Sequence, residues 1–262
     1  MIAPFSTQKP LIAAIHLAPS LSYESFHGVQ RSLDEFAADL DACIAGGLDG
    51  ILLENENDKP HTLMVGKAQV AWLTRVAVFA RSRTALPVGL NVQRIDWDAT
   101  LAVAAAAELP FVRLDTFVDK VVMQGETIDL DPAAIRALRA SLRAEHIALF
   151  TDIHVKHATP VDAMPLEESA RVALREGAAA LLISGNRTGE APNTNDFARI
   201  RKAIPSAPLV IASGLTKENA SVLAPLADAA IVGTSLKEGE RVSLARVKEL
   251  VSAWKRACAS QP

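Results

Sequence analysis

The stretch Ile147-Ala148-Leu149-Phe150-Thr151-Asp152-Ile153-His154-Val155-Lys156-His157 begins with apolar residues and ends with charged and titratable ones. We interpret it as a buried strand over 147–154 that opens into a polar mouth. Because side chains alternate between the faces of a strand, Asp152, His154 and Lys156 would share one face. Such a cluster can share protons, bind a metal ion or hold an anion. The alternative is a strand that carries ordinary surface charges into solvent.

Apolar runs of this kind recur along the chain, and a helical pattern follows each of them. The predicted strands are 11–15, 50–53, 87–92, 111–114, 147–154, 180–184, 208–212 and 229–232. The first predicted helix begins near Ser32 and ends at Gly46-Gly47, and the fourth begins at Asp131-Pro132. The other predicted helices cover 67–83, 98–107, 165–176, 194–203, 216–224 and 243–258. Two helix starts carry capping signals, namely Ser32 with Glu35 in capping-box spacing and Asp131 before a first-turn proline.

This alternation predicts an α/β fold, a single (β/α)8 TIM barrel over 1–262 with an irregular N-terminal segment at about 1–10. A helix between two strands returns the chain in the same direction, so the strands would be parallel. Nearly all-apolar strands are typical of a sheet that is covered on both faces. An open doubly wound sheet is the alternative, but no glycine-rich dinucleotide turn follows the first strand.

Composition narrows the functional classes. The chain has 262 residues, of which 50% are hydrophobic, and a net charge of −3, so it can bury a large core but has no overall basic character that would favour nucleic acid. It has no apolar run of about eighteen residues, and Met1-Ile2-Ala3-Pro4 does not begin a signal peptide, so no membrane span and a cytoplasmic location are expected. Cys43 and Cys258 lie within helical patterns, which argues against a disulfide or a cysteine zinc site.

Polar residues stand at the carboxyl ends of the predicted strands, where barrels of this kind place their active sites. The candidate catalytic residues are Asp152, His154, Lys156, Glu54 and His16, and the candidate substrate-binding residues are Asn55, Asn91, Arg113, Asp115, Ser184 and Ser213. Structural roles are the alternative for single members. Asn91 would then satisfy a backbone group, and Arg113 would pair with Asp115 or Glu54.

Two glycine turns predict a phosphate site. Ser213-Gly214-Leu215-Thr216 follows the seventh predicted strand and Gly233-Thr234-Ser235 follows the eighth, where barrels often bind phosphate through backbone N–H groups. We therefore expect Gly214, Gly233 and Thr234 to hold phosphate, with Lys237 either neutralising it or solvated. The alternative is a pair of ordinary turns in which Thr216 caps a helix.

A divalent metal ion is a variant of the same site. Asp152, His154, Glu54 and His16 offer oxygen and nitrogen donors, but they come from three predicted strands. Lys156 nearby disfavours a metal, because two cations repel unless an anion lies between them. No other cofactor is expected.

The chain resembles a known family. The resemblance rests on Asp49-Gly50-Ile51 with Glu54-Asn55 and Asp58-Lys59-Pro60, Gly89-Leu90-Asn91-Val92, Asp152 with Val155-Lys156-His157, Ser213-Gly214-Leu215-Thr216-Lys217-Glu218-Asn219, and Val232-Gly233-Thr234 with Leu236-Lys237. These motifs are similar to those of the BtpA family, which includes SgcQ-like proteins. The resemblance implies a TIM barrel akin to phosphate-binding barrels, with one lineage associated with photosystem I assembly and others with sugar metabolism. The loop 17–21 departs from the family's usual proline- and glycine-rich turn, and Asp115 stands where asparagine is common.

Two functional hypotheses follow. The first is an enzyme, an isomerase, lyase or hydrolase, that acts on a small phosphorylated metabolite such as a sugar or nucleoside phosphate. Within it, Lys156 would be either a Schiff-base lysine or a fixed positive charge. The second, by resemblance, is a noncatalytic assembly factor for a membrane complex of the photosystem I type, which would dock through a surface such as the last helix. A homo-oligomer is compatible with either hypothesis.

Overall fold

Parallel strands close into a barrel in the computed structural model, which describes all residues except 156, 163, 186, 188 and 260–262. The barrel strands are β1 (Leu11–His16), β2 (Gly50–Glu54), β3 (Val88–Asn91), β4 (Phe111–Leu114), β7 (Ala148–Asp152), β9 (Ala178–Ile183), β10 (Leu209–Ile211) and β11 (Ala229–Val232). They pair in the order β1-β11-β10-β9-β7-β4-β3-β2, and each pairing is parallel. The predicted (β/α)8 TIM barrel is therefore confirmed.

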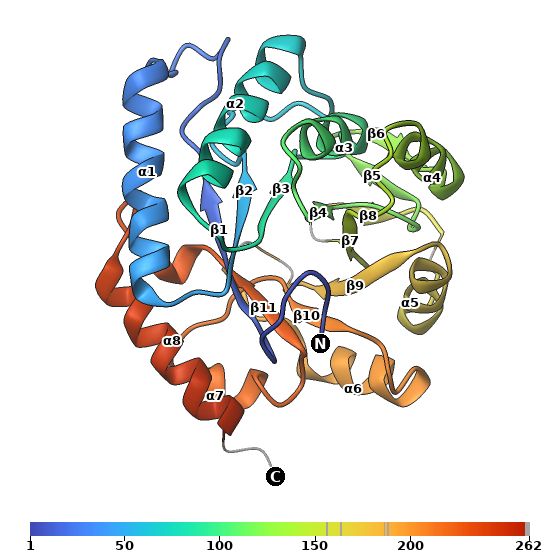
Figure 1. The fold of residues 1–262 in the computed structure, drawn as a ribbon. Helices are drawn as coiled ribbons and strands as arrows, with labels where there is room; N and C mark the ends of the chain where they lie inside the picture. The colour runs from blue at the N-terminus through green and yellow to red at the C-terminus, as the bar shows by residue number, and fades with distance from the viewer. Residues whose placement is uncertain (156, 163, 186, 188, 260–262) are drawn as a thin grey trace.

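Helices surround this barrel, as Figure 1 shows. They are α1 (Val29–Gly46), α2 (Lys67–Arg83), α3 (Trp97–Ala106), α4 (Pro132–Ser141), α5 (Leu166–Arg175), α6 (Thr194–Ala203), α7 (Ala220–Leu223) and α8 (Leu244–Ala259), with a short 3-10 helix η1 (Thr234–Leu236). Shorter strands lie outside the barrel. They are β5 (Val121–Met123), β6 (Glu126–Ile128) and β8 (Thr159–Pro160), which form one antiparallel sheet, and the hairpin β12 (Lys237–Glu238) and β13 (Arg241–Val242).

The hydrophobic core has two layers, one between strands and helices and one inside the barrel. Phe111 and Phe150 meet inside the barrel with ring centroids 5.2 Å apart, and Phe5 packs on Phe111 at 5.4 Å. Residues 1–10 form no helix or strand, yet Ile2 and Phe5 are buried against the inner layer. The N-terminal segment therefore closes the barrel end that lies opposite the carboxyl ends of the strands (Figure 1).

One capping prediction is confirmed and one is wrong. The Asp131 side chain accepts a hydrogen bond from the Ala133 N–H at the head of α4, where Pro132 is the first residue. In contrast, α1 begins at Val29, so Ser32 lies inside the helix, with its Oγ buried and no hydrogen-bond partner among the described residues. The chain begins the helix three residues before the capping-box signal because Gly28 supplies the non-helical turn.

The strand predicted over 147–154 ends earlier. β7 stops at Asp152, and His154 has φ 50°, a left-handed conformation that interrupts the strand alternation. The expectation that Asp152 and His154 share one face is therefore wrong. The helix predicted over 216–224 is also shorter, because Asn219 accepts a hydrogen bond from the Thr216 N–H and donates one to the Gly214 carbonyl, which holds this segment as a turn.

The two cysteines differ in accessibility. Cys43 is fully buried, and burial raises the pKa of its thiol to about 12, whereas Cys258 is half-buried. Because the thiolate is the reactive form, Cys258 should react with a thiol reagent much faster than Cys43 in the native protein. A titration with Ellman's reagent should show one fast equivalent in buffer and two in denaturant. Two fast equivalents in buffer would contradict the burial of Cys43.

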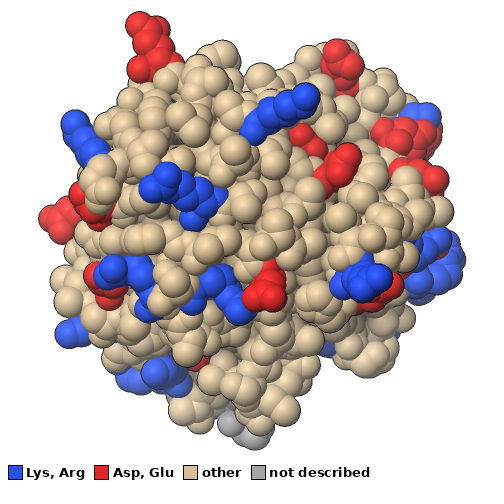
Figure 2. All heavy atoms as spheres, turned by 45° about the horizontal axis from the view of Figure 1, so that its top comes forward, with Lys and Arg blue, Asp and Glu red and all other residues tan. Residues whose placement is uncertain are grey.

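Positive and negative side chains are interspersed over the face in Figure 2, with no large patch of either sign. Within the described residues, no helix has both the length and the apolar character needed to cross a membrane.

Candidate functional site

The loops at the carboxyl ends of the barrel strands surround a cavity of about 760 Å³. Eight of the candidate residues contribute to its lining, namely His16, Glu54, Arg113, Asp115, Ser213, Gly214, Gly233 and Thr234. They come from both halves of the chain and meet because parallel strands in a closed barrel direct all their carboxyl ends to the same side.

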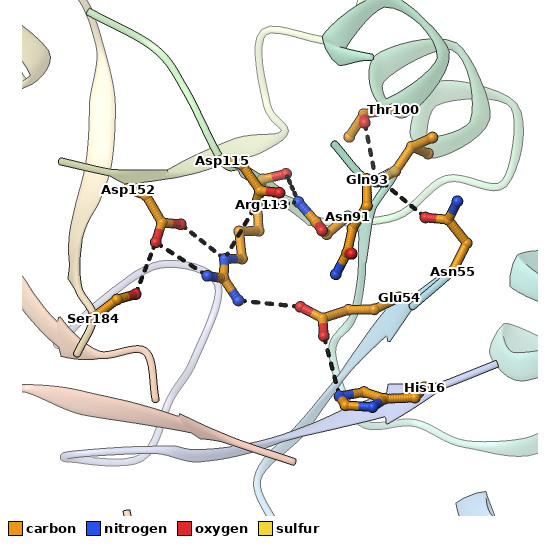
Figure 3. Close-up of polar contacts among 11 residues, drawn as sticks. His16, Glu54, Asn55, Asn91, Gln93, Thr100, Arg113, Asp115, Asp152 and Ser184 are labelled. Carbon is orange, nitrogen blue, oxygen red and sulfur yellow. Dashed lines mark hydrogen bonds and ion pairs between the residues drawn. The ribbon is translucent and has the colours of Figure 1, made fainter. Parts of the chain in front are cut away.

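Arg113, on β4, is the centre of a buried ion cluster (Figure 3). Its Nε and Nη2 donate to the two carboxylate oxygens of Asp152 at 2.8 and 3.0 Å, and its Nη1 donates to Glu54 Oε1 at 3.1 Å. Burial alone would lower the pKa of Arg113, but the carboxylates of Asp152 and Glu54 raise it above its ordinary value. The guanidinium therefore stays charged and holds β2, β4 and β7 together at the cavity floor.

His16 extends this cluster toward β1. Its Nε2 lies 3.5 Å from Glu54 Oε2, and only 13% of its side chain is exposed. Burial lowers the pKa of His16, and the Glu54 carboxylate opposes that shift. At neutral pH the imidazole is therefore mainly neutral, so its unprotonated ring nitrogen can accept a proton.

Asp115 follows β4 and faces the cavity beside Arg113. Its Oδ1 accepts a hydrogen bond from Asn91 Nδ2 at 3.1 Å and lies 3.6 Å from Arg113 Nε. Burial raises the pKa of Asp115 to about 7; Arg113 opposes the shift, and the Asp152 and Glu54 carboxylates reinforce it. This carboxyl group therefore changes protonation state near neutral pH, which an exposed aspartate does not do.

Asn91 and Asn55 orient their neighbours. Asn91 is 1% exposed and also donates to the Arg113 carbonyl at 3.0 Å. Asn55 is 2% exposed; its Oδ1 accepts from the Gln93 N–H at 2.8 Å, and its Nδ2 donates to Asp58. Asn91 thus links β3 to β4 and the residue after it, and Asn55 links the loops after β2 and β3. Contact of either asparagine with a ligand stays a prediction.

Asp152 and Ser184 lie behind Arg113. The Asp152 side chain is 0% exposed, and its Oδ1 also accepts from Ser184 Oγ at 3.0 Å. Asp152 therefore acts on the cavity through the guanidinium that it holds. Ser184 borders a neighbouring cavity of about 390 Å³ between the segment after β7 and α5, and Val155 and His157 line both cavities.

His154 does not extend the cluster as the strand alternation predicted. His154 is exposed, its N–H donates to Asp119 Oδ2 at 2.8 Å, and its Nε2 lies 2.9 Å from the Met164 carbonyl. It borders the 390 Å³ cavity with Ser184. Lys156 lies outside the described residues.

The glycine loops after β10 and β11 form another part of the cavity lining, next to His16. A Cβ at Gly233 would lie 3.0 Å from His16 Nε2, so this glycine allows the backbone to approach the imidazole. Gly214 has φ 66°, and a Cβ there would lie 2.2 Å from the Ala191 N atom. Ser213 Oγ accepts from the Gly185 N–H and donates to the Glu190 carbonyl, which ties the loop after β9 to this wall. Gly214 thus serves loop packing as well as lining the cavity.

Several lining residues were not identified from the sequence, namely Glu56, Gln93, Arg94 and Arg246. Burial would raise the pKa of Glu56, but His16 and Arg94 nearby lower it below its ordinary value. Gln93 and Arg94 directly follow the third predicted strand, so extending the strand-end rule by two residues would have included them. Arg246 lies in the first turn of α8, where no strand-end rule applies.

Three of the four candidate metal ligands, Asp152, Glu54 and His16, meet in the Arg113 ion cluster, but they do not form a metal site. His154 lies apart from Asp152, Glu54 and His16, and Arg113 occupies oxygens of both carboxylates. Within the described part of the chain, no group of three or more His, Cys, Asp or Glu side chains has an arrangement that could hold a metal ion.

Solved structures share this fold at low sequence identity. Thiamine phosphate pyrophosphorylase from Pyrococcus furiosus superimposes with a TM-score of 0.61 at 15% identity, covering 95% of this chain and 96% of that one. 3-Hexulose-6-phosphate synthase from Salmonella typhimurium gives 0.61 at 14% identity, with 95% and 99% covered. At these identities the likeness shows the TIM-barrel fold alone.

Sequence relatives align over nearly the whole chain. A protein of Archaeoglobus fulgidus is 32% identical over 250 residues, covering 95% of this chain and 99% of that protein. The Photosystem I biogenesis protein BtpA of Synechocystis sp. is 29% identical over 265 residues, covering 98% and 92%. The model of the BtpA family matches residues 7–256. The chain therefore belongs to the BtpA family, as the resemblance of its motifs predicted.

Proposed function

We propose that the protein is an enzyme that acts on a small phosphorylated metabolite, a sugar or nucleoside phosphate, at the carboxyl end of the barrel. The observation that carries this proposal is the division of one cavity into two chemically different walls. One wall has glycines and hydroxyl groups, and the other has a buried cluster of ionisable groups. An isomerase, a lyase and a hydrolase all fit this arrangement.

The glycine and hydroxyl wall suits a phosphate group. Gly233, Thr234 and Ser235 open the 3-10 helix η1, and Thr234 is exposed to the cavity. Backbone N–H groups at a helix start and side-chain hydroxyls are donors that bind phosphate oxygens. Arg246 adds a positive charge at the rim, beside Lys217, which pairs with Glu249. The phosphate would therefore sit between the loops after β10 and β11.

The ionisable wall suits the reacting end of the substrate. Burial lowers the pKa of His16 and raises the pKa of Asp115 to about 7, and both residues line the cavity. Perturbed groups in a cleft are typical of general acids and bases. Glu54 and Arg113 lie between them and would hold polar groups of the substrate.

The solved structures support this choice of substrate class. The names thiamine phosphate pyrophosphorylase and 3-hexulose-6-phosphate synthase both specify a phosphorylated compound. The Synechocystis relative instead suggests an assembly factor as a second candidate. Of the apolar positions of α8 that were considered for docking, Leu244 is exposed, whereas Val247, Leu250, Val251 and Trp254 are buried between the helices and the strands, which does not favour docking through this helix. A cytoplasmic location is part of the enzyme proposal.

A thermal-shift experiment tests the proposal. Ribose 5-phosphate, glucose 6-phosphate and nucleoside monophosphates should be compared with their unphosphorylated forms. A ligand that binds the folded state adds ~2.7 kcal/mol of stability at a concentration 100 times its Kd. We expect the melting temperature to rise with at least one phosphorylated compound and not with its unphosphorylated form. Equal shifts within each pair, or no shift with any compound, would contradict the phosphate site.

The variant Thr234→Val tests whether the Thr234 hydroxyl binds the phosphate group. Losing one hydrogen bond to a charged group costs ~1.5 kcal/mol, so phosphate-dependent affinity should fall by about tenfold. Thr127→Val, an exposed threonine on β6, is the control and should leave affinity unchanged. Valine at Gly214 or Gly233 is a poorer choice, because the side chain would collide with Ala191 or His16 and disturb the loops themselves.

A further inference from the structure

We propose that Asp115 is the residue that exchanges a proton with a carbon atom of the substrate, through its Oδ2 atom. The substrate class is then a sugar phosphate that presents a carbonyl group, and the reaction includes an isomerisation step. This inference rests on the proposed function.

The carboxylates around Arg113 differ in what their oxygens are free to do. Asp152 is 0% exposed, and both of its oxygens accept hydrogen bonds from Arg113. Glu54 has one oxygen on Arg113 Nη1 and the other 3.5 Å from His16 Nε2. Asp115 is 10% exposed toward the cavity, and among the described residues its hydrogen bond and ion pair use Oδ1. Within the described part of the chain, Asp115 Oδ2 is therefore the oxygen of these three carboxylates that makes neither a hydrogen bond nor an ion pair, which leaves it available to a substrate.

Asp115 is also fixed in orientation. Asn91 donates to Asp115 Oδ1 and to the Arg113 carbonyl with the same amide nitrogen, which links the loop after β4 to β3. A base that is held in place requires no further ordering when it attacks a substrate proton. The positioning role of Asn91 is thus part of the same arrangement (Figure 3).

The electrostatic surroundings match proton exchange. The charged groups that face Asp115 are Arg113 on β4, Asp152 on β7, Glu54 on β2 and Arg94 after β3. Burial, reinforced by Asp152 and Glu54 and opposed by Arg113 and Arg94, raises the pKa of Asp115 to about 7. Near neutral pH the protonated and ionised forms are both populated, so the group can accept a proton and return it.

The step balances without an added reactant. The Asp115 carboxylate takes the proton from the carbon next to the substrate carbonyl and becomes a carboxylic acid. The electron pair of the broken C–H bond forms the C=C bond of an enediolate, and the carbonyl oxygen takes the negative charge. The proton of the neighbouring hydroxyl passes to that oxygen, and the acid returns its proton to the former carbonyl carbon, which restores the carboxylate and moves the carbonyl by one position.

Hydrogen exchange with deuterated solvent tests this step. The protein is incubated in D2O with ribose 5-phosphate, ribulose 5-phosphate, glucose 6-phosphate or fructose 6-phosphate, and proton NMR follows deuterium entering the carbon next to the carbonyl. Thermal shift measures binding of the same compounds. We expect exchange with at least one compound, at a rate that rises with pH through about 7 as the carboxylate forms.

Asp115→Asn keeps the shape and the acceptor for Asn91 but removes the ionisable group. Exchange should slow by about 100-fold, with affinity for the same compound within about threefold of wild type. Asp129→Asn is the control, because Asp129 is 64% exposed and pairs with Lys120 at the surface. It should change neither quantity. Asp115→Glu is a second variant that retains a carboxyl group in a displaced position, so exchange should fall here too.

The outcomes separate the two proposals. The role of Asp115 would be overturned if Asp115→Asn or Asp115→Glu exchanged hydrogen at the rate of the wild-type protein. It would also be overturned if the wild-type protein bound phosphorylated sugars without exchanging hydrogen. Either outcome would leave the phosphate site standing. Failure of every phosphorylated compound to bind would overturn the proposed function and this inference with it.

Discussion

Arg113→Met is expected to lower the free energy of unfolding by about 3–5 kcal/mol near pH 8. The change removes the cation that contacts Glu54, Asp115 and Asp152, all of which are buried. Buried carboxylates without a cation favour their protonated forms, so their pKa values in the folded variant would lie above those of the unfolded chain. Stability of that kind is present at low pH and is lost as the pH rises through the folded-state pKa. The loss should therefore be smaller at pH 5 than at pH 8.

Urea unfolding at both pH values measures this difference. Arg83→Met is the control, because Arg83 pairs with Asp41 at 2.9 Å on the surface, with 39% of its side chain exposed. An exposed pair of this kind is worth about 1 kcal/mol or less. If Arg113→Met destabilised the protein no more than Arg83→Met, the ion cluster would not hold the barrel floor.

Asp152→Asn is expected to reduce turnover of a phosphorylated substrate by about 100-fold, equivalent to ~3 kcal/mol of transition-state stabilisation. Asparagine offers one acceptor oxygen where Asp152 offers two, and its NH2 group would face the guanidinium donors of Arg113. Arg113 would lose a hydrogen bond and its orientation, while its bond to Glu54 remains. Since the phosphate wall is untouched, kcat should fall more than the affinity for substrate.

Steady-state kinetics with the substrate from the thermal-shift screen measure this split. Thr151→Val is the control on the same strand. Thr151 points to the opposite face of β7, its Oγ1 is buried without a hydrogen-bond partner among the described residues, and valine has the same shape. A loss of turnover in Thr151→Val as large as in Asp152→Asn would show that strand packing, and not Arg113, causes the effect.

Local sequence patterns predicted the barrel and most of its elements. The helix boundaries 67–83 and 194–203 and the strand 229–232 match α2, α6 and β11. Asp131 and Pro132 also mark the true start of α4. These features depend on residues that are neighbours in the sequence or one helical turn apart, so composition and spacing contain the necessary information.

The barrel rule also placed His16, Glu54, Arg113 and Asp115 at one cavity, because each follows an apolar strand and parallel strands end on the same side. It failed for His154. Alternation holds only while the backbone stays extended, and the positive φ at His154 turns its side chain toward Met164. The Asp119 side chain, which binds the His154 N–H, is 35 residues away and left no local signal.

The sequence by itself determined the family, the barrel and the side of the barrel on which polar side chains gather. Only the tertiary structure decided which carboxylate supports Arg113 and which one faces the cavity. Asp152 and Asp115 are the same residue type at the end of neighbouring strands, yet one is 0% and the other 10% exposed. That difference depends on distances between β2, β4 and β7, which are remote in the sequence. Burial and charge pairing, and therefore the pKa values on which proton transfer depends, are set by those distances.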